Sequence, residues 1–344
     1  IQQNREVLTK ICQMQHSKNQ FEQNRLIFIT YLNELLTLKS KMIFGKQPYS
    51  CSICFKWTDT IKGKEWESYN IFFEIYNVLF NLGIVYFCLG IHYANEAGDD
   101  KNKNKESCNN YKTALGIFVV IKEEAYCRIA KNELPYDLYP SHLEYFERLC
   151  IIYGQLQIIE IAKHISKDEY FLHAKLLLCV SENFNIAFKL SNTAPTTKGG
   201  TEEYRYFLKN RASYFFGRVY EKLRDKTQKH FDETGEGFGE ALILQGRFVQ
   251  QLLECQKTIE NCGKLVNIND FQGLLKKEQE TGQKMYDLNE RIYHQATPAD
   301  FKVEIEIKDL MFPSLPQDLY IGKNKDKAKK EGETLYPELN MLLP

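Results

Sequence analysis

The chain has 344 residues, of which 43% are apolar and 26% are charged. This composition supports a sizeable hydrophobic core and excludes a fibrous or wholly disordered protein. Lysine plus arginine and aspartate plus glutamate both number 45, so the net charge is zero and predicts no nucleic-acid partner. The ten cysteines are scattered and too sparse for a disulfide scaffold. We therefore expect a cytoplasmic protein with reduced thiols.

Helical periodicity runs through most of the chain. Only three prolines lie between residues 49 and 297, which leaves long stretches that suit helices. In the first segment Val7, Ile11 and Met14 recur at helical spacing. Further helices are expected over residues 20–43, 67–95, 106–131, 140–165, 167–190, 202–228, 236–263 and 268–293.

The most apolar stretch lies at residues 71–94. It contains Glu74, Asn77 and His92, and its tyrosines are spread along it rather than gathered at its ends. This pattern favours a buried helix of a soluble domain over a transmembrane span. The first residues show no basic region followed by an apolar run, so we expect no signal peptide.

Gly83, Tyr86 and Gly90 have the small and aromatic spacing of a tetratricopeptide helix. In such a helix, glycine lets the neighbouring helix approach closely. No regular period follows these residues along the chain. The sequence therefore favours an irregular helical solenoid over a regular repeat array.

Two short segments break the helical pattern. Residues 51–57 alternate well enough for a strand, and residues 301–308 alternate more clearly between apolar and charged side chains. Two strands so far apart in the sequence predict a small β-sheet attached to a helical body. Beyond Met311 the chain becomes rich in proline and lysine, which favours an extended tail. We therefore predict one helical domain over residues 1–312 and a tail over residues 313–344.

Seven short strings follow one another along most of the chain. They lie at residues 55–59, 78–83, 111–123, 137–140, 155–157, 238–242 and 289–298. The third string, for example, places Tyr111, Ala114 and Phe118 in helical register. In this order the seven strings resemble the Bro-one domain found in Alix-type ESCRT adaptor proteins.

That resemblance implies a mainly α fold: an elongated, curved helical solenoid with a tetratricopeptide-like centre and a small appended β-sheet. The N-terminal strands of the family have no counterpart in the sequence. The resemblance also implies a non-enzymatic adaptor that binds the amphipathic C-terminal helix of an ESCRT-III subunit of the Snf/CHMP class. Such adaptors act in endosomal sorting or membrane scission. We accordingly expect a cytoplasmic protein that associates with endosomes, and with membranes only through its partners.

The resemblance places a binding surface for the partner helix as well. Aligning residues 174–176 with the family's Ala-Lys-Leu puts two aliphatic contact residues at Leu172 and Leu176. The aromatic contact residue of the family falls on Glu160, and a carboxylate there weakens an apolar groove. We therefore expect the neighbouring Ile161 to supply the third side of the surface.

The residues themselves leave two functions open. Residues 172–180 are apolar almost all round the helix, which is wider than a single buried stripe. Either both helix faces are buried, or one face is free to bind a partner's helix. In the alternative function, the chain is a structural scaffold subunit whose apolar stripe is buried permanently by neighbouring subunits of a larger assembly. The carboxylate of Glu160 favours that alternative.

The motifs do not support an enzyme. Cys51 and Cys54 have the spacing of a zinc or redox pair, but no second ligand pair follows and the pair lies in a predicted strand. The histidines show no metal-ligand or catalytic spacing, and the glycine-rich residues 235–239 follow no predicted strand. We expect structural cysteines and no catalytic residue, metal or cofactor.

Two features mark the predicted tail. Residues 335–339, Leu-Tyr-Pro-Glu-Leu, resemble the linear motif that the V domains of Alix-type proteins bind. The lysine cluster at residues 323–330 is most simply a solvated charge run, with contact to acidic lipid or protein surfaces as the alternative.

Overall fold

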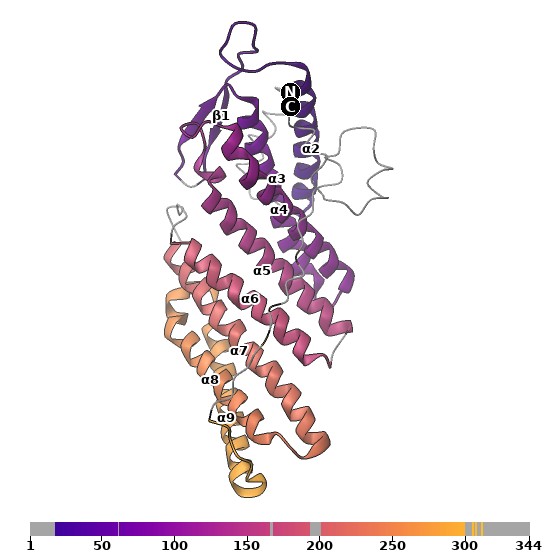
Figure 1. Cartoon of the computed structure of the whole chain (residues 1–344), viewed down its shortest axis with the longest axis vertical. Coiled ribbons are helices and arrows are strands. Elements are labelled where there is room, and N and C mark those ends of the chain that lie inside the picture. The colour runs from indigo at the N-terminus through magenta and orange to yellow at the C-terminus, as the bar shows by residue number, and fades with distance from the viewer. Residues whose placement is uncertain are drawn as a thin grey trace. The chain divides into compact units, whose positions relative to one another are not determined.

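The computed structural model describes residues 18–60, 62–165, 168–192 and 201–299, together with Ile305, Ile307 and Met311. Apart from one two-stranded sheet, the regular elements among these residues are helices (Figure 1). The eight α-helices are α2 (Lys18–Lys41), α3 (Ile71–Ala97), α4 (Lys101–Arg128), α5 (Pro140–Ile165), α6 (Tyr170–Leu190), α7 (Thr201–Thr234), α8 (Phe238–Ile259) and α9 (Ile268–Leu288). The predicted mainly α fold with a small β-sheet is confirmed. The helix predicted around Val7 and the two tail features lie outside the described residues.

The helices follow the predicted segments closely, and capping explains why one of them starts earlier than predicted. α5 has the predicted bounds, with Pro140 in its first position, where a helix needs no N–H donor. α4 begins at Lys101, ahead of the predicted start. The carboxylate of Asp100 accepts hydrogen bonds there from the backbone N–H groups of Asn102 and Lys103, at 2.9 and 3.4 Å.

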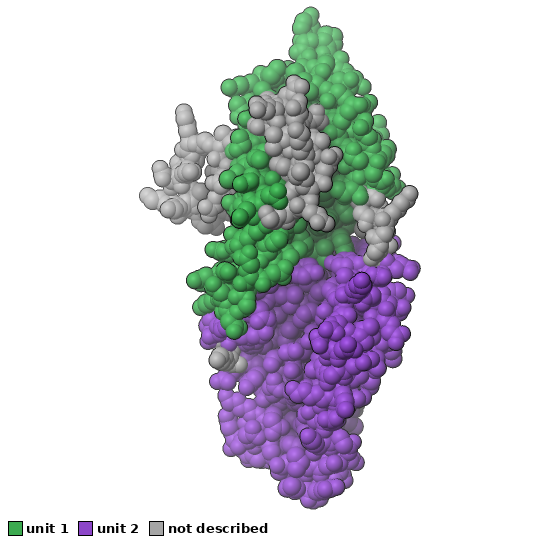
Figure 2. Space-filling model, turned by 180° about the vertical axis from the view of Figure 1, so that it is seen from behind, with its two compact units in different colours: residues 1–150, 312–344 green, residues 151–311 purple. Residues whose placement is uncertain are grey.

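The described residues fall into two compact units (Figure 2). Unit 1 comprises residues 18–150 of the described chain, with α2, α3, α4, the sheet and the start of α5. Unit 2 comprises residues 151–311, with the rest of α5 and helices α6 to α9. Each of the two units has its own buried side chains.

In unit 1, α3 and α4 pack at close range because glycines of α3 face aromatic rings of α4. A Cβ atom added at Gly83 would lie 2.8 Å from the ring of Phe118, and one added at Gly90 would lie 2.7 Å from the ring of Tyr111. The close approach predicted from the glycine spacing is therefore confirmed. α3 is also the one described helix long and apolar enough to cross a membrane, and 72% of its apolar window is buried, as in a core helix.

The sheet of unit 1 is a local hairpin. β1 (Phe55–Thr58) and β2 (Glu65–Ser68) pair in antiparallel orientation. The carboxylate of Asp59 holds the connecting turn, since it accepts hydrogen bonds from the Lys62 backbone N–H and the Trp66 indole N–H, both at 2.6 Å. Side-chain oxygens of aspartate commonly replace backbone acceptors in such turns.

The sequence predicted only part of this sheet. β1 covers the end of the predicted strand at residues 51–57, while Cys51 makes only an isolated bridge. Its partner β2 is the next strand along the chain, and the sequence interpretation did not predict it. The predicted strand at residues 301–308 lies outside the described residues except for Ile305 and Ile307, and neither of these is in a strand.

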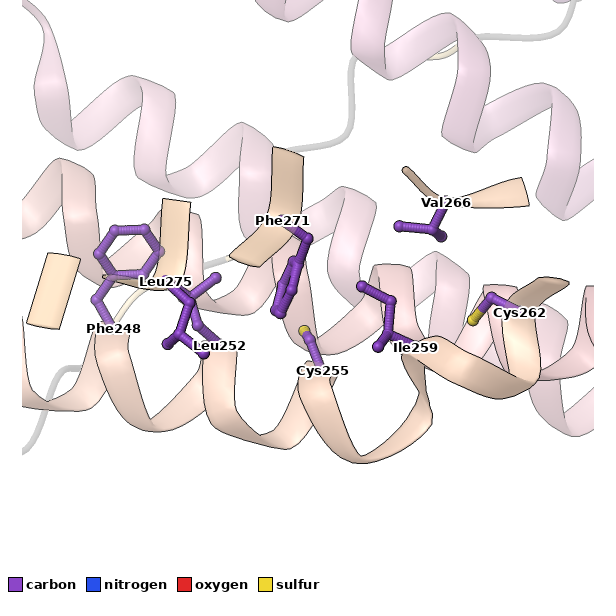
Figure 3. Close-up of a cluster of buried hydrophobic side chains, with 8 residues drawn as sticks. All are labelled: Phe248, Leu252, Cys255, Ile259, Cys262, Val266, Phe271 and Leu275. Atoms are coloured by element: carbon purple, nitrogen blue, oxygen red, sulfur yellow. The ribbon is translucent and has the colours of Figure 1, made fainter. Parts of the chain in front are cut away.

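In unit 2 a buried core joins α8 and α9 through the short 3-10 helix at Glu260–Leu265 (Figure 3). The core consists of Phe248, Leu252, Cys255, Ile259, Cys262, Val266, Phe271 and Leu275. Burial raises the pKa of the Cys255 thiol to about 12, which keeps the sulfur protonated and unreactive. Among the described residues five cysteines are buried in the core: Cys108, Cys150, Cys179, Cys255 and Cys262.

The start of α8 is capped by a residue far along the chain. Gly237 precedes the helix and offers no side-chain cap. Instead, the side-chain oxygen of Gln295 accepts hydrogen bonds from the backbone N–H groups of Gly237 and Phe238, at 3.0 and 2.7 Å. Gly239 leaves room for this segment, because a Cβ there would clash with the Ala296 carbonyl oxygen. The strings at residues 238–242 and 289–298, two of the seven that resemble the family, are therefore in contact, and the second caps the helix that the first begins.

Candidate partner-helix surface on α5 and α6

The three predicted contact residues lie on α5 and α6 within unit 2. Ile161, near the end of α5, and Leu172, in the first turn of α6, are half-buried and present part of their side chains to solvent. Leu176 is 0% exposed. A side chain without accessible surface cannot touch a partner, so Leu176 is a core residue of α6 and not a contact residue.

Most of the apolar run on α6 is buried. Six of the nine residues at 172–180 are buried. Contacts with α7 continue the burial: the Ser181 hydroxyl donates to the Ala212 carbonyl at 2.8 Å, and the rings of Phe184 and Phe215 stack at 5.6 Å. The width of the apolar run therefore reflects burial on more than one face, and only part of the run remains for a partner.

Two large apolar side chains near this surface are exposed, although the sequence interpretation did not select them. Ile165 is 62% exposed and Phe171 is 36% exposed. The ammonium groups of Lys175 and Lys226 lie 5.0 and 4.8 Å from the centre of the Phe171 ring, within the range of cation–π attraction. The sequence did carry a signal for Phe171: it is a large aromatic residue directly before the predicted contact residue Leu172.

Glu160 stands where the resemblance places an aromatic residue. Its carboxylate pairs with the Lys163 ammonium at 2.6 Å, and 43% of the Glu160 side chain is exposed. Exposed pairs of this kind contribute little to stability. The apolar part of the surface therefore depends on Ile161, Leu172 and the exposed Phe171.

A separate hollow of about 660 Å³ lies between α8 and α9 in unit 2. Apolar and uncharged polar side chains line most of it, and Glu290 is its charged lining residue. In the described part of the chain, no group of three His, Cys, Asp or Glu residues is placed to hold a metal ion. Cys51 and Cys54 are free and half-buried in unit 1.

The fold defines a class of protein: a large helical domain with glycine-packed helices, a small hairpin sheet and partly exposed apolar helix surfaces. Residues 1–340 match the BRO1-like domain family, and the chain belongs to that family. The resemblance found in the seven strings is therefore confirmed. No curated protein sequence matches the chain.

Three solved structures share this fold. The ALIX BRO1 domain in complex with CHMP4C matches with a TM-score of 0.74 and 17% identity, over 91% of this chain and 85% of that one. ALIX in complex with the SIVmac239 PYKEVTEDL late domain matches with a TM-score of 0.71 and 18% identity, over 91% and 44% of the two chains. A Bro1 domain described for endosomal targeting matches with a TM-score of 0.66 and 15% identity, over 90% and 80%. At these identities the likeness shows the fold.

Proposed function

We propose that this chain is a non-enzymatic adaptor that binds the amphipathic C-terminal helix of an ESCRT-III subunit of the CHMP class. The observation that carries the proposal is the shared fold over 91% of the chain with a BRO1 domain solved together with CHMP4C. Membership of the BRO1-like family supports it. The adaptor acts in endosomal sorting or membrane scission, at the cytoplasmic face of endosomes, and reaches the membrane through its partners.

The proposed contact residues are Ile161 and Leu172, joined by Phe171. All three have accessible apolar surface on the end of α5 or the first turn of α6. A helix bound here would place apolar residues at i, i+3, i+4 and i+7 against these side chains. Leu176 supports the surface from within the core of unit 2.

The test is a calorimetric titration of the purified chain with a CHMP C-terminal helix peptide. Leu172→Asp desolvates a carboxylate against the apolar face of the peptide. Loss of a central contact costs about 2 kcal/mol or more, so Kd should rise at least about thirtyfold. The matched control is Leu253→Asp, because Leu253 is a 38% exposed leucine on α8, and it should leave Kd unchanged. Wild-type affinity in a folded Leu172→Asp variant would refute this site.

A second candidate function is that of a scaffold subunit in a larger assembly, and the exposed Glu160–Lys163 pair favours it. In that function neighbouring subunits cover the apolar surface permanently. Sedimentation of the purified chain separates the two functions, because an adaptor is a stable monomer whereas an isolated scaffold subunit self-associates or precipitates.

A further inference from the structure

A small basic cavity lies in unit 2 where the end of α5, the first turn of α6 and the middle of α7 meet. Its volume is about 270 Å³. The lining side chains come from these three helices and are Lys163, Tyr170, His173, Arg218 and Lys222. α6 and α7 lie next to each other in Figure 1. Every lining residue carries a cationic or hydrogen-bonding group, and no described carboxylate lines the cavity.

Acidic residues outside the cavity hold two of these cations in place. Lys163 pairs with Glu160 at 2.6 Å and Lys222 pairs with Asp225 at 3.2 Å, in each case three residues apart on the same helix. Such pairs limit the rotamers of the long side chains, so less entropy is lost when a ligand binds. Neither Glu160 nor Asp225 lines the cavity, so the residues that face a ligand there are the cations.

Lys222 and Arg218 are more enclosed than the third ion-paired cation of the cavity, Lys163. The side chains of Arg218 and Lys222 are 30% and 22% exposed. The Arg218 guanidinium also pairs with Glu221 and donates to the Tyr214 hydroxyl at 3.3 Å. Partial removal from water strengthens the attraction of these cations for an anion, because solvent screens it less.

The first turn of α6 adds a second source of positive potential. α6 is 21 residues long, and its N-cap residue Glu169 makes no side-chain capping hydrogen bond. The N-terminal N–H groups of a helix attract anions. Tyr170 and His173 bring a phenol and an imidazole from the same turn to the cavity wall. The two adjacent acids, Asp168 and Glu169, are both exposed, and Asp168 lies 3.9 Å from Lys229.

We propose that this basic cavity binds a phosphate monoester. A phosphate monoester carries nearly two negative charges and three terminal oxygens. The cavity offers three cations to these oxygens: Lys163 on α5, and Arg218 and Lys222 on α7. A carboxylate offers only two oxygens and one charge. The volume lies below the usual range of drug-sized pockets, so the cavity holds one phosphorylated headgroup rather than a large ligand. The residues that line this cavity differ from Ile161, Phe171 and Leu172 of the proposed partner-helix surface, although both sets lie on the end of α5 and the first turn of α6.

Two probes distinguish a soluble source of the phosphate from a lipid source. The first is calorimetric titration of the full chain with inositol monophosphate. The second is co-sedimentation with phosphatidylcholine vesicles that contain or lack phosphatidylinositol monophosphate. Binding of the soluble probe or selective binding of the phosphorylated vesicles supports the proposal and names the source. If neither probe binds, the proposal is wrong.

The variants Lys163→Gln and Lys222→Gln each remove one cavity cation and keep a polar side chain. Each should weaken binding at least about tenfold, the loss expected for a charge-assisted hydrogen bond. Lys257→Gln is the matched control, because Lys257 forms the same kind of pair with Glu254 at 2.6 Å on α8. Unchanged binding in both cavity variants, or equal weakening in all three, would overturn the assignment. Unaltered thermal denaturation midpoints verify that the variants are folded.

Discussion

The close packing of α3 on α4 leads to a quantitative prediction for Gly90→Ala. The added methyl carbon would lie 2.7, 2.8 and 2.9 Å from three atoms of the Tyr111 ring. Tyr111 is 1% exposed and its ring sits edge-on to Phe87 at 5.5 Å, so the ring has no free space to move into. Overpacking of this kind costs about 2–3 kcal/mol.

Alanine also stabilises a helix interior by about 1 kcal/mol relative to glycine. Gly90→Ala should therefore lower the free energy of unfolding by about 1–2 kcal/mol, the difference between the two effects. Gly246→Ala is the control. Gly246 lies in the interior of α8, and a Cβ there meets no atom within 4 Å. The free energy of unfolding of this variant should therefore rise by the helix propensity of alanine alone.

The assay is urea denaturation of both variants and the wild type, followed by circular dichroism. The propensity term cancels between the variants, and their unfolding free energies should differ by the overpacking cost of about 2–3 kcal/mol. Equal stability of Gly90→Ala and Gly246→Ala would refute the argument that α3 and α4 are in rigid contact at this glycine.

Two further predictions concern buried side chains. Burial lowers the pKa of His142 from its usual 6.5 to about 4, and neither ring nitrogen has a hydrogen-bond partner among the described residues. A lowered folded-state pKa adds stability above pH 6.5 that is lost as the pH falls through 4. The free energy of unfolding of the wild type should thus fall by about 3 kcal/mol between pH 6.5 and pH 4. The variant His142→Phe should not show this fall. Its ring suits the neighbouring ring of Phe146, whose centre lies 4.9 Å from that of His142. Equal acid sensitivity in urea titrations at both pH values would contradict this. Leu176→Ala should lower the unfolding free energy by about 2–5 kcal/mol because Leu176 is fully buried, whereas a loss below 1 kcal/mol would mean that its side chain is accessible.

Periodicity and local chemistry predicted the parts of the fold that depend on neighbours in sequence. The bounds of α5 and the close approach at Gly83 and Gly90 are of this kind. β2 was missed because four residues with two buried side chains give too short an alternation. Its pairing depends on the turn that Asp59 holds, and that turn could not be recognised from alternation alone.

The candidate site was predicted less completely, for reasons of burial. Apolarity marks residues that avoid water, but it does not separate a core side chain such as Leu176 from a surface one such as Leu172. That distinction depends on where α7 packs. The basic cavity could not be predicted from the sequence, because Lys163 and Arg218 lie on different helices and come together only in the folded unit.

The capping of α8 by Gln295 has a consequence for synthesis on the ribosome. α8 is complete in sequence at Ile259. The acceptor for the N–H groups of its N-cap Gly237 and its first residue Phe238 is Gln295, which is synthesised later and must first leave the ribosome. Until then these N–H groups hydrogen-bond to water instead of a fixed acceptor, so the first turn of α8 frays more readily. A nascent chain paused within α9 should therefore expose a frayed start of α8 to proteases, and the release of Gln295 from the ribosome should protect it.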